Sequence, residues 1–378
     1  MLALSASLAL AQGECKRTGL INVHRNHLAV RIPPSSATSP LPPGPQGLQE
    51  RMRTLQFASG SGAYLSIEEY ARRNCVTSLL VAKDGRLVFE RYYQGTRADD
   101  RLYSASMAKT LAAVMVGILV HEGQLALSAT VKDTLPGFDA SAFADDTVED
   151  LLRMTSAAAL KDCYSDTACS QGDNQLLNVQ ISPAADTAGY LRSKTERSAP
   201  PGARFFYSGA QTALLGLMVH RLSESRPERL WQTRIWEPIG AEHDAYWIVN
   251  NRGELGYQCC YNAAARDWLR LGIMLAQEGE IEGRRVLPAE VVRRMHSANP
   301  AKAQPLQGGR YGLQVWIPTY TPKGTQRTME LRGSYGQFLV IDPEQRLVIL
   351  HTGNARSEQF PFPDWPRLRH RIQAEFSR

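Results

Sequence analysis

Strand-forming runs near the two ends of the chain enclose a long middle part with helical periodicity, and this order restricts the fold most. Residues 78–82 (SLLVA) and 87–91 (LVFER) favour β-structure, and the Lys-Asp-Gly turn at 83–85 between them predicts a hairpin. Strand-like runs return near the carboxyl end at 311–317, 337–341 and 347–351. The order predicts an α/β (α+β) protein, in which a mostly helical region is inserted into an antiparallel sheet flanked by helices.

Helical spacing of apolar residues predicts the elements of the middle part and one helix at the end of the chain. These helices are expected over residues 106–122, 148–154, 210–223, 265–278 and 364–377. The run 111–120 (LAAVMVGILV) lies between Lys109 and His121-Glu122, and it is shorter than the roughly 18 residues of a membrane helix. It predicts a buried helix, and no membrane span is expected.

Composition divides the 378 residues into segments. The stretch 33–47 (PPSSATSPLPPGPQG) is too rich in proline and serine to pack as a core, which indicates a linker or an arm extended around the body. We therefore predict a signal-peptide remnant at residues 1–11 and an amino-terminal Pro-rich arm at 12–60. A sheet region is expected in two parts, 61–102 and 291–378, with a helical region at 103–290 between them.

The first eleven residues (MLALSASLALA) resemble the apolar centre of a secretory signal, and Ala9-Leu10-Ala11 fits the small-x-small cleavage pattern. An even number of cysteines agrees with an oxidising compartment, so we expect a periplasmic or secreted protein. Cys163 and Cys169 flank a polar loop and are the best candidates for a local disulfide. The adjacent Cys259 and Cys260 could bond to each other or to other cysteines. With Cys15 and Cys75 the six residues allow 15 connectivities, and the pairing stays open.

Charge argues against a nucleic-acid partner. Lysine and arginine number 43 against 37 acidic residues, and the two signs are interleaved along the chain. A nucleic-acid-binding protein gathers its basic residues into patches. No metal or other cofactor is expected either, because no cysteine pair has C-x-x-C spacing and no histidine lies at zinc-finger distance. The isolated His121 and His351 fit core or rim histidines.

Ser106-Met107-Ala108-Lys109 opens the predicted helix 106–122. Residues i and i+3 share one face of a helix, so Lys109 lies about one turn from Ser106. A serine nucleophile needs such a base, together with donors for the oxyanion, which a helix amino terminus offers. The alternative interpretation is a serine N-cap followed by a solvated lysine. Because the following residues are strongly apolar, this helix should be buried. A solvated lysine does not fit a buried first turn, so the presence of Lys109 there needs another explanation.

Two further motifs follow along the chain. A Pro-Pro-Gly turn and two phenylalanines precede Tyr207-Ser208-Gly209, so a phenol could reach a site at the start of the next helix, although a lone tyrosine is more often a half-buried core residue. Ser334-Tyr335-Gly336-Gln337 stands directly before a strand, where glycine permits close backbone approach and the Gln337 N–H could face a cleft. Taken alone, the second of these fits a bent loop better than a catalytic element.

Together, in this order, the three motifs resemble those of the serine β-lactamase and penicillin-binding-protein superfamily. The resemblance runs from about residue 78 to 377 and includes the connecting segments 81–85, 122–125, 147–156, 201–205, 214–217, 236–240 and 265–267. It is closest to the branch of class C β-lactamases, carboxylesterases and 6-aminohexanoate-dimer (nylon-oligomer) hydrolases. The resemblance implies a β-lactamase/transpeptidase-like fold.

The resemblance also implies roles. Ser106 would be the nucleophile, Lys109 its base, and Tyr207 a second proton carrier. The backbone N–H groups of Ser106 and Gln337 would form the oxyanion hole. Ser334, Tyr335, Gly336, Gly209 and Gln258 would line the substrate cleft.

Departures from the family pattern bear on the substrate. Members that act on β-lactams or D-alanyl peptides have Tyr-x-Asn and Lys-Thr-Gly, where this chain has Tyr207-Ser208-Gly209 and Ser334-Tyr335-Gly336. The groups that would hold a substrate amide and carboxylate are absent. We therefore predict a serine hydrolase for a small ester or amide, carboxylesterase-like or 6-aminohexanoate-oligomer-hydrolase-like, and the sequence leaves its oligomeric state open.

Two alternatives remain. One is a β-lactamase or D-alanyl-D-alanine carboxypeptidase. The other is a catalytically silent relative that binds peptidoglycan or a protein partner, although a binding module would not need Ser106, Lys109 and Tyr207 together. A further departure is Gln258-Cys259-Cys260-Tyr261, where many relatives have a Gly-rich segment, so the cleft wall is expected to differ there.

Overall fold

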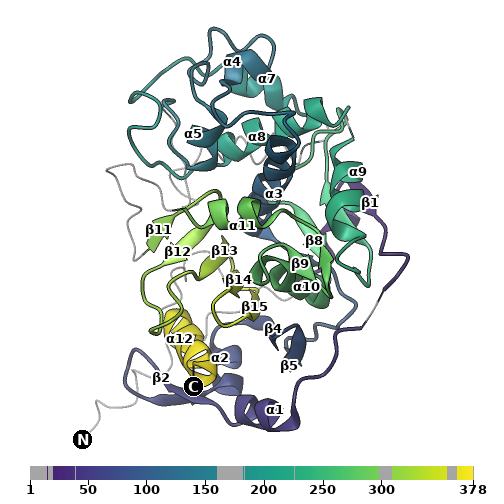
Figure 1. Cartoon of the computed structure of the whole chain (residues 1–378), viewed down its shortest axis with the longest axis vertical. Helices are drawn as coiled ribbons and strands as arrows, with labels where there is room; N and C mark the ends of the chain where they lie inside the picture. The colour runs from purple at the N-terminus through teal and green to yellow at the C-terminus, as the bar shows by residue number, and fades with distance from the viewer. Residues whose placement is uncertain are drawn as a thin grey trace, which may run out of the picture.

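A computed structural model gives the architecture (Figure 1) and describes residues 15, 20–38, 40–159, 182, 184–224, 226–297, 309–355 and 364–377. The predicted signal remnant and the pair Cys163/Cys169 lie outside these residues. A seven-stranded antiparallel sheet forms the main layer, and its strands run in the order β11 (Gly309–Tyr311), β12 (Trp316–Pro318), β13 (Met329–Gly333), β14 (Gln337–Asp342), β15 (Leu347–Gly353), β4 (Val76–Lys83) and β5 (Arg86–Tyr92).

A second antiparallel sheet has four strands, in the order β1 (Ala29–Ile32), β7 (Ala245–Ile248), β8 (Tyr261–Ala263) and β6 (Leu102–Tyr103). Two short hairpins complete the β-structure: β2 (Gln56–Ala58) with β3 (Tyr64–Ser66), and β9 (Glu280–Ile281) with β10 (Arg284–Arg285). The part of the chain expected to be helical, 103–290, thus also supplies β7 and β8. This second sheet was not predicted from the sequence.

Helices cover both faces of the main sheet and build a separate end of the molecule (Figure 1). The α-helices are α1 (Gln46–Arg53), α2 (Ile67–Arg73), α3 (Ala108–His121), α4 (Val131–Thr134), α5 (Val148–Leu152), α7 (Thr187–Arg192), α8 (Gly209–Leu222), α9 (Pro227–Trp231), α10 (Ala265–Ala276), α11 (Ala289–Met295) and α12 (Trp365–Phe376). Short 3₁₀ turns form η1 (Val23–Asn26) and η2 (Ala105–Met107), and η3 (Gln232–Trp236) is π-helical.

The alternation of side chains along the central strands separates two hydrophobic cores. Phe338, Val340 and Ile349 pack with α2 and α12, whereas Leu339 and Leu350 pack with α3 and α10 on the opposite face. This is the period-two arrangement of a sheet buried on both sides. The predicted antiparallel sheet flanked by helices is confirmed.

The hairpin predicted at 78–91 is β4 and β5, and Asp84 and Gly85 turn with φ of 52° and 75°. This is the left-handed backbone that Asp-Gly favours. The predicted helices 106–122, 210–223, 265–278 and 364–377 correspond to η2–α3, α8, α10 and α12. The predicted helix 148–154 ends earlier, at Leu152, because Met154 has a φ of 60°.

The single strand predicted over 311–317 is wrong. The chain turns at Gly312–Val315, where the Gly312 N–H donates to the Val315 carbonyl over 2.9 Å, and this turn separates β11 from β12. The Gln314 side chain is buried, and its Nε2 donates to the Leu151 carbonyl at 2.9 Å. Satisfying this buried amide requires the tight turn. Strand β13 was not predicted either, because charged residues interrupt its apolar pattern.

The described part of the Pro-rich arm lies along the body. Its β1 pairs with β7, and Pro43 bridges to Leu87 of β5. A disulfide joins Cys15 to Cys75 in the structure, across 60 residues of sequence.

Candidate active site

Ser106 lies in the middle of η2, directly before the buried helix α3, and its side chain is partly exposed. The preceding Ala105 has a φ of 42°, a left-handed conformation that is costly for a residue with a β-carbon and is frequent at functional sites. Glycine at 333 lets η2 approach β13, since a β-carbon there would lie 2.5 Å from the Ser104 carbonyl oxygen. The close approach brings Ser106 to the ends of β13 and β14.

Lys109 is the buried partner of Ser106. Its side chain is only 4% exposed, and its Nζ donates to Ser106 Oγ over 3.2 Å and to the Gln258 backbone carbonyl over 2.9 Å. An amine buried in this way must be hydrogen-bonded, and one of its partners is the expected nucleophile. Since the alternative interpretation was a solvated lysine, this burial favours the lysine as a base.

Tyr207 extends the site on the other side of Lys109. The lysine Nζ lies 5.2 Å from the centre of the Tyr207 ring, and the tyrosine is partly exposed. Ser208 caps α8, its hydroxyl accepting from the Ala210 N–H, and Gly209 is the first residue of that helix. The cap fixes the start of α8 directly beside the tyrosine.

An aromatic wall adjoins Tyr207, and the sequence analysis missed it. The rings of Trp316 and Tyr311 lie 5.4 and 5.9 Å from that of Tyr207, and Phe205 packs against Tyr311 at 5.2 Å. Only the turn between β11 and β12 brings Tyr311 and Trp316 to one place, so a single predicted strand could not reveal the wall.

The loop Ser334–Gly336 joins β13 to β14, and Tyr335 and Gly336 have φ of 68° and 91°. Gln337 follows as the first residue of β14, and its side-chain Nε2 donates to the Gly353 carbonyl over 2.7 Å. Its side chain therefore faces protein, and only its backbone could serve a substrate. Both strands that flank the loop contact η2.

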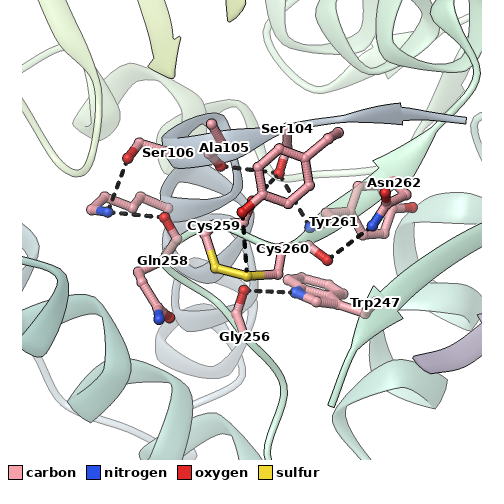
Figure 2. The surroundings of a disulfide bond; sticks show 12 residues. Ser104, Ala105, Ser106, Trp247, Gly256, Gln258, Cys259, Cys260, Tyr261 and Asn262 are labelled. Carbon is pink, nitrogen blue, oxygen red and sulfur yellow. Dashed lines mark hydrogen bonds between the residues drawn. A yellow bond between two sulfur atoms is a disulfide. The ribbon is translucent and has the colours of Figure 1, made fainter. Parts of the chain in front are cut away.

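The segment after Gln258 carries a bond between adjacent cysteines, Cys259 and Cys260 (Figure 2). The Ser104 hydroxyl donates to the Cys259 carbonyl over 2.7 Å and accepts from the Tyr261 N–H over 3.1 Å. The segment is thus tied to η2, while the Gln258 carbonyl holds Lys109. Gln258 was expected to contact substrate, but its side chain is 5% exposed, and its carbonyl contacts the lysine instead.

A buried charge cluster lies behind the aromatic wall. Arg332 contacts Glu330 at 2.5 Å and stands over the Trp316 ring at 5.0 Å, and Arg369 lies 3.4 Å from the same carboxylate. Burial raises the pKa of Glu330, but the two guanidinium groups outweigh it and leave the pKa below its ordinary value. Glu330 therefore pairs with two arginines at once, and the cluster keeps one net positive charge.

The structure brings Ser106, Lys109, the Gln258 carbonyl and Tyr207 together, with the loop 334–336 beside them. Within the described ranges, no group of three or more histidine, cysteine, aspartate or glutamate residues is arranged to hold a metal ion. Among the same residues, none of the helices has the length and apolarity needed to cross a bilayer.

The family model described as Beta-lactamase matches residues 68–374. The chain is 25% identical over 324 residues to the 6-aminohexanoate-dimer hydrolase of Paenarthrobacter ureafaciens, covering 82% of this chain and 80% of that protein. A solved structure from Bacillus anthracis, whose description names a 6-aminohexanoate-dimer hydrolase, is similar with a TM-score of 0.81 at 23% identity, over 95% of this chain and 94% of that one. A family VIII carboxylesterase is similar with a TM-score of 0.60 at 17% identity, over 75% and 87% of the two chains.

Proposed function

The chain belongs to the beta-lactamase family of serine hydrolases, and we propose that it cleaves an ester or a neutral amide through an acyl-enzyme on Ser106. The prediction of the family and of its fold is confirmed. The observation that carries the proposal is the position of the buried Lys109 Nζ. It lies 3.2 Å from Ser106 Oγ and is held there by its hydrogen bond to the Gln258 carbonyl.

In the proposed reaction, neutral Lys109 accepts the Ser106 hydroxyl proton while Oγ attacks the substrate carbonyl carbon. The oxyanion that forms accepts hydrogen bonds from the Ser106 and Gln337 N–H groups. Tyr207 passes a proton to the departing alcohol or amine as the carbon–oxygen or carbon–nitrogen bond breaks. Lys109 then restores the proton of Tyr207 and is neutral again. A water molecule gives a proton to Lys109 as its oxygen attacks the acyl carbon, and this proton passes to Ser106 Oγ as the acyl–Oγ bond breaks and the acid leaves.

Side chains around the site support an uncharged substrate with apolar groups. Phe205, Tyr207 and Trp316 are partly exposed on one side, and the Arg332 guanidinium is paired with Glu330. The loop 334–336 carries no cation that could bind a carboxylate, and Gly209 has no side chain that could hold an amide. A β-lactam or a D-alanyl peptide would lack both partners.

Labelling with a fluorophosphonate and, separately, with a fluorescent penicillin tests the proposal. We expect the fluorophosphonate alone to modify Ser106, as seen by peptide mass spectrometry, and Ser106→Ala to remain unmodified. Strong penicillin labelling would favour a β-lactamase or carboxypeptidase instead. A folded wild type that neither reagent modifies, and that hydrolyses neither p-nitrophenyl butyrate nor the linear 6-aminohexanoate dimer, would favour the silent binding protein.

We also propose that the protein is exported and that its cysteines are oxidised, based on the apolar amino terminus and the even cysteine number. Fractionation of the producing cells, with amino-terminal sequencing of the mature chain, tests export. A cytoplasmic chain that keeps residues 1–11 would contradict it.

Oxidised Cys259–Cys260 is expected to support turnover more than stability. A bond between neighbours closes almost no loop, so it adds little chain-entropy stabilisation. The Cys259→Ala/Cys260→Ala variant is expected to lower kcat by about tenfold, because a displaced Gln258 carbonyl no longer holds Lys109 in line with Ser106. The matched Cys15→Ala/Cys75→Ala variant, whose bond lies in the core packed by α2 and α12 and not in the segment that holds Lys109, should keep kcat. Equal kcat values in both variants would refute the expectation.

A further inference from the structure

His351 lies in β15 and forms two buried hydrogen bonds that the proposed mechanism does not use. Its Nδ1 is 2.7 Å from the Gly336 carbonyl oxygen, and its Nε2 is 3.1 Å from the Tyr70 hydroxyl. A carbonyl oxygen can only accept, so Nδ1 carries the proton, and the Tyr70 hydroxyl donates to Nε2. The tyrosine of α2 therefore selects the Nδ1–H tautomer.

The Gly336 carbonyl belongs to the same peptide group as the Gln337 N–H. A peptide group is planar and trans, so its C=O and N–H point in opposite directions. His351 continues the series Leu347 and Ile349 on the face of the sheet that α2 and α12 cover. The Gly336 carbonyl, held by His351, therefore points to that face, and the Gln337 N–H points away from it.

The opposite face carries the expected nucleophile. Leu339 and Ile341 pack there with α3, the helix that follows Ser106, and η2 contacts the ends of β13 and β14. A β-carbon on Gly333 would lie 2.9 Å from Ala105 Cβ and 3.0 Å from Gln337 Cβ, which shows how closely η2 and the start of β14 approach. The Gln337 N–H thus points toward the side of the sheet on which Ser106 lies.

We propose that His351 is a positioning residue for the oxyanion hole: its Nδ1–H binds the Gly336 carbonyl and thereby aims the Gln337 N–H at the oxyanion formed at Ser106. This inference rests on the proposed hydrolase function and adds a residue to that same site. Tyr70 acts one step further back, by fixing the tautomer.

The surroundings suit this role. His351 is fully buried, and its ring lies 4.7 Å from that of Trp365 and 5.5 Å from that of Phe338. Burial lowers the pKa of His351 to about 4, so the ring is neutral near pH 7 and keeps one donor and one acceptor. The Ala355 N–H donates to the Tyr335 carbonyl over 3.3 Å, which braces the same loop.

Two variants of nearly equal size separate positioning from packing. In His351→Asn the side-chain nitrogen can occupy the place of His Nδ1 and donate to the Gly336 carbonyl. In His351→Leu the side chain is close in shape to asparagine but has no donor. Because loss of a whole oxyanion donor costs about 10²–10³ in kcat, we expect His351→Leu to lower kcat for p-nitrophenyl butyrate by about 10- to 100-fold, with KM nearly unchanged. His351→Asn should recover most of that loss.

Affinity for an arylboronic acid, which forms a tetrahedral anion on serine, should fall in His351→Leu by the same factor as kcat. A purely structural role would lower the melting temperature of both variants alike and leave kcat of the folded protein unchanged. The proposal is overturned if His351→Leu keeps kcat within about twofold, or if His351→Asn is no better than His351→Leu.

Failure of the proposed function has a different signature, since the wild type itself would then show no turnover and no fluorophosphonate labelling. The hydrogen bond from His351 to Gly336 can still be tested in a protein without turnover, because long-range ¹H–¹⁵N spectra report the tautomer of His351 without substrate. An Nδ1–H ring supports the hydrogen bond to Gly336, and an Nε2–H ring overturns it.

Discussion

Replacing Lys109 with alanine is expected to lower kcat for p-nitrophenyl butyrate by about a thousandfold or more, because Ser106 then has no base within reach of its hydroxyl. The lysine is 4% exposed, and it is the side chain placed 3.2 Å from Ser106 Oγ. KM should change little, since the lysine acts on the nucleophile and not on the ground-state substrate. Steady-state kinetics with an activated ester measures both parameters.

Two controls make the Lys109 result specific. Lys323→Ala removes an exposed lysine outside the site and should leave kcat unchanged. The double variant Ser106→Ala/Lys109→Ala should be hardly slower than either single variant, because residues that act as one unit are strongly non-additive. Turnover that persists in folded Lys109→Ala would show that another group is the base.

Glu330→Gln is expected to lower the free energy of unfolding by about 3–5 kcal/mol, the usual cost of removing one partner from a buried ion pair. Glu330 is fully buried, and Arg369, 2% exposed, would then keep a charge whose carboxylate partner at 330 is gone. Trp365 Nε1, which now donates to Glu330 over 2.7 Å, could still donate to the new amide. The loss therefore reports charge rather than packing, and urea unfolding measures it.

The dependence of this stability on pH has a definite sign. The folded pKa of Glu330 lies below its ordinary value, so its contribution is complete above the unfolded pKa of about 4.3. That contribution is lost as the pH falls through the lower, folded pKa. Glu330→Gln should therefore lose less stability on acidification than the wild type does.

Glu290→Gln is the matched control for Glu330→Gln. Its carboxylate pairs with Arg294 at 2.7 Å, but the two side chains are 62% and 52% exposed. Exposed pairs of this kind contribute about 0–1 kcal/mol, so the unfolding midpoint should hardly move. If both variants lost the same free energy, the cluster around Glu330 would not depend on its buried charge.

The sequence predicted those parts of the fold and site that local pattern determines. The Asp-Gly hairpin, the apolar helix after Ser106 and the i, i+3 spacing of Ser106 and Lys109 each follow from a few neighbouring residues. The turn at Gly312–Val315 does not, because it depends on the hydrogen bond that Gln314 donates to α5 and on the one that it accepts from Thr212 of α8, and both helices are distant in sequence. The contact of Lys109 with the Gln258 carbonyl could not be predicted from the sequence either, since every residue type has a backbone carbonyl and the two residues are distant in sequence.

His351 illustrates a further limit. An isolated histidine in an apolar run fits a core residue, and it is indeed buried. Its hydrogen bond to Gly336 depends on the register that pairs β15 with β14, and its tautomer depends on α2. Neither register nor tautomer can be read from the residues around position 351.

The central pairing of β15 with β4 has a consequence for how the molecule is made. Strand β4 belongs to the first quarter of the chain and β15 to its last tenth, yet they are neighbours in the main sheet. Contacts between such distant residues require a large loop to close before they stabilise anything, which makes folding slow. A ribosome that has synthesised only the middle of the chain holds neither a closed sheet nor the strand that begins at Gln337. Catalytic competence thus arrives late and all at once.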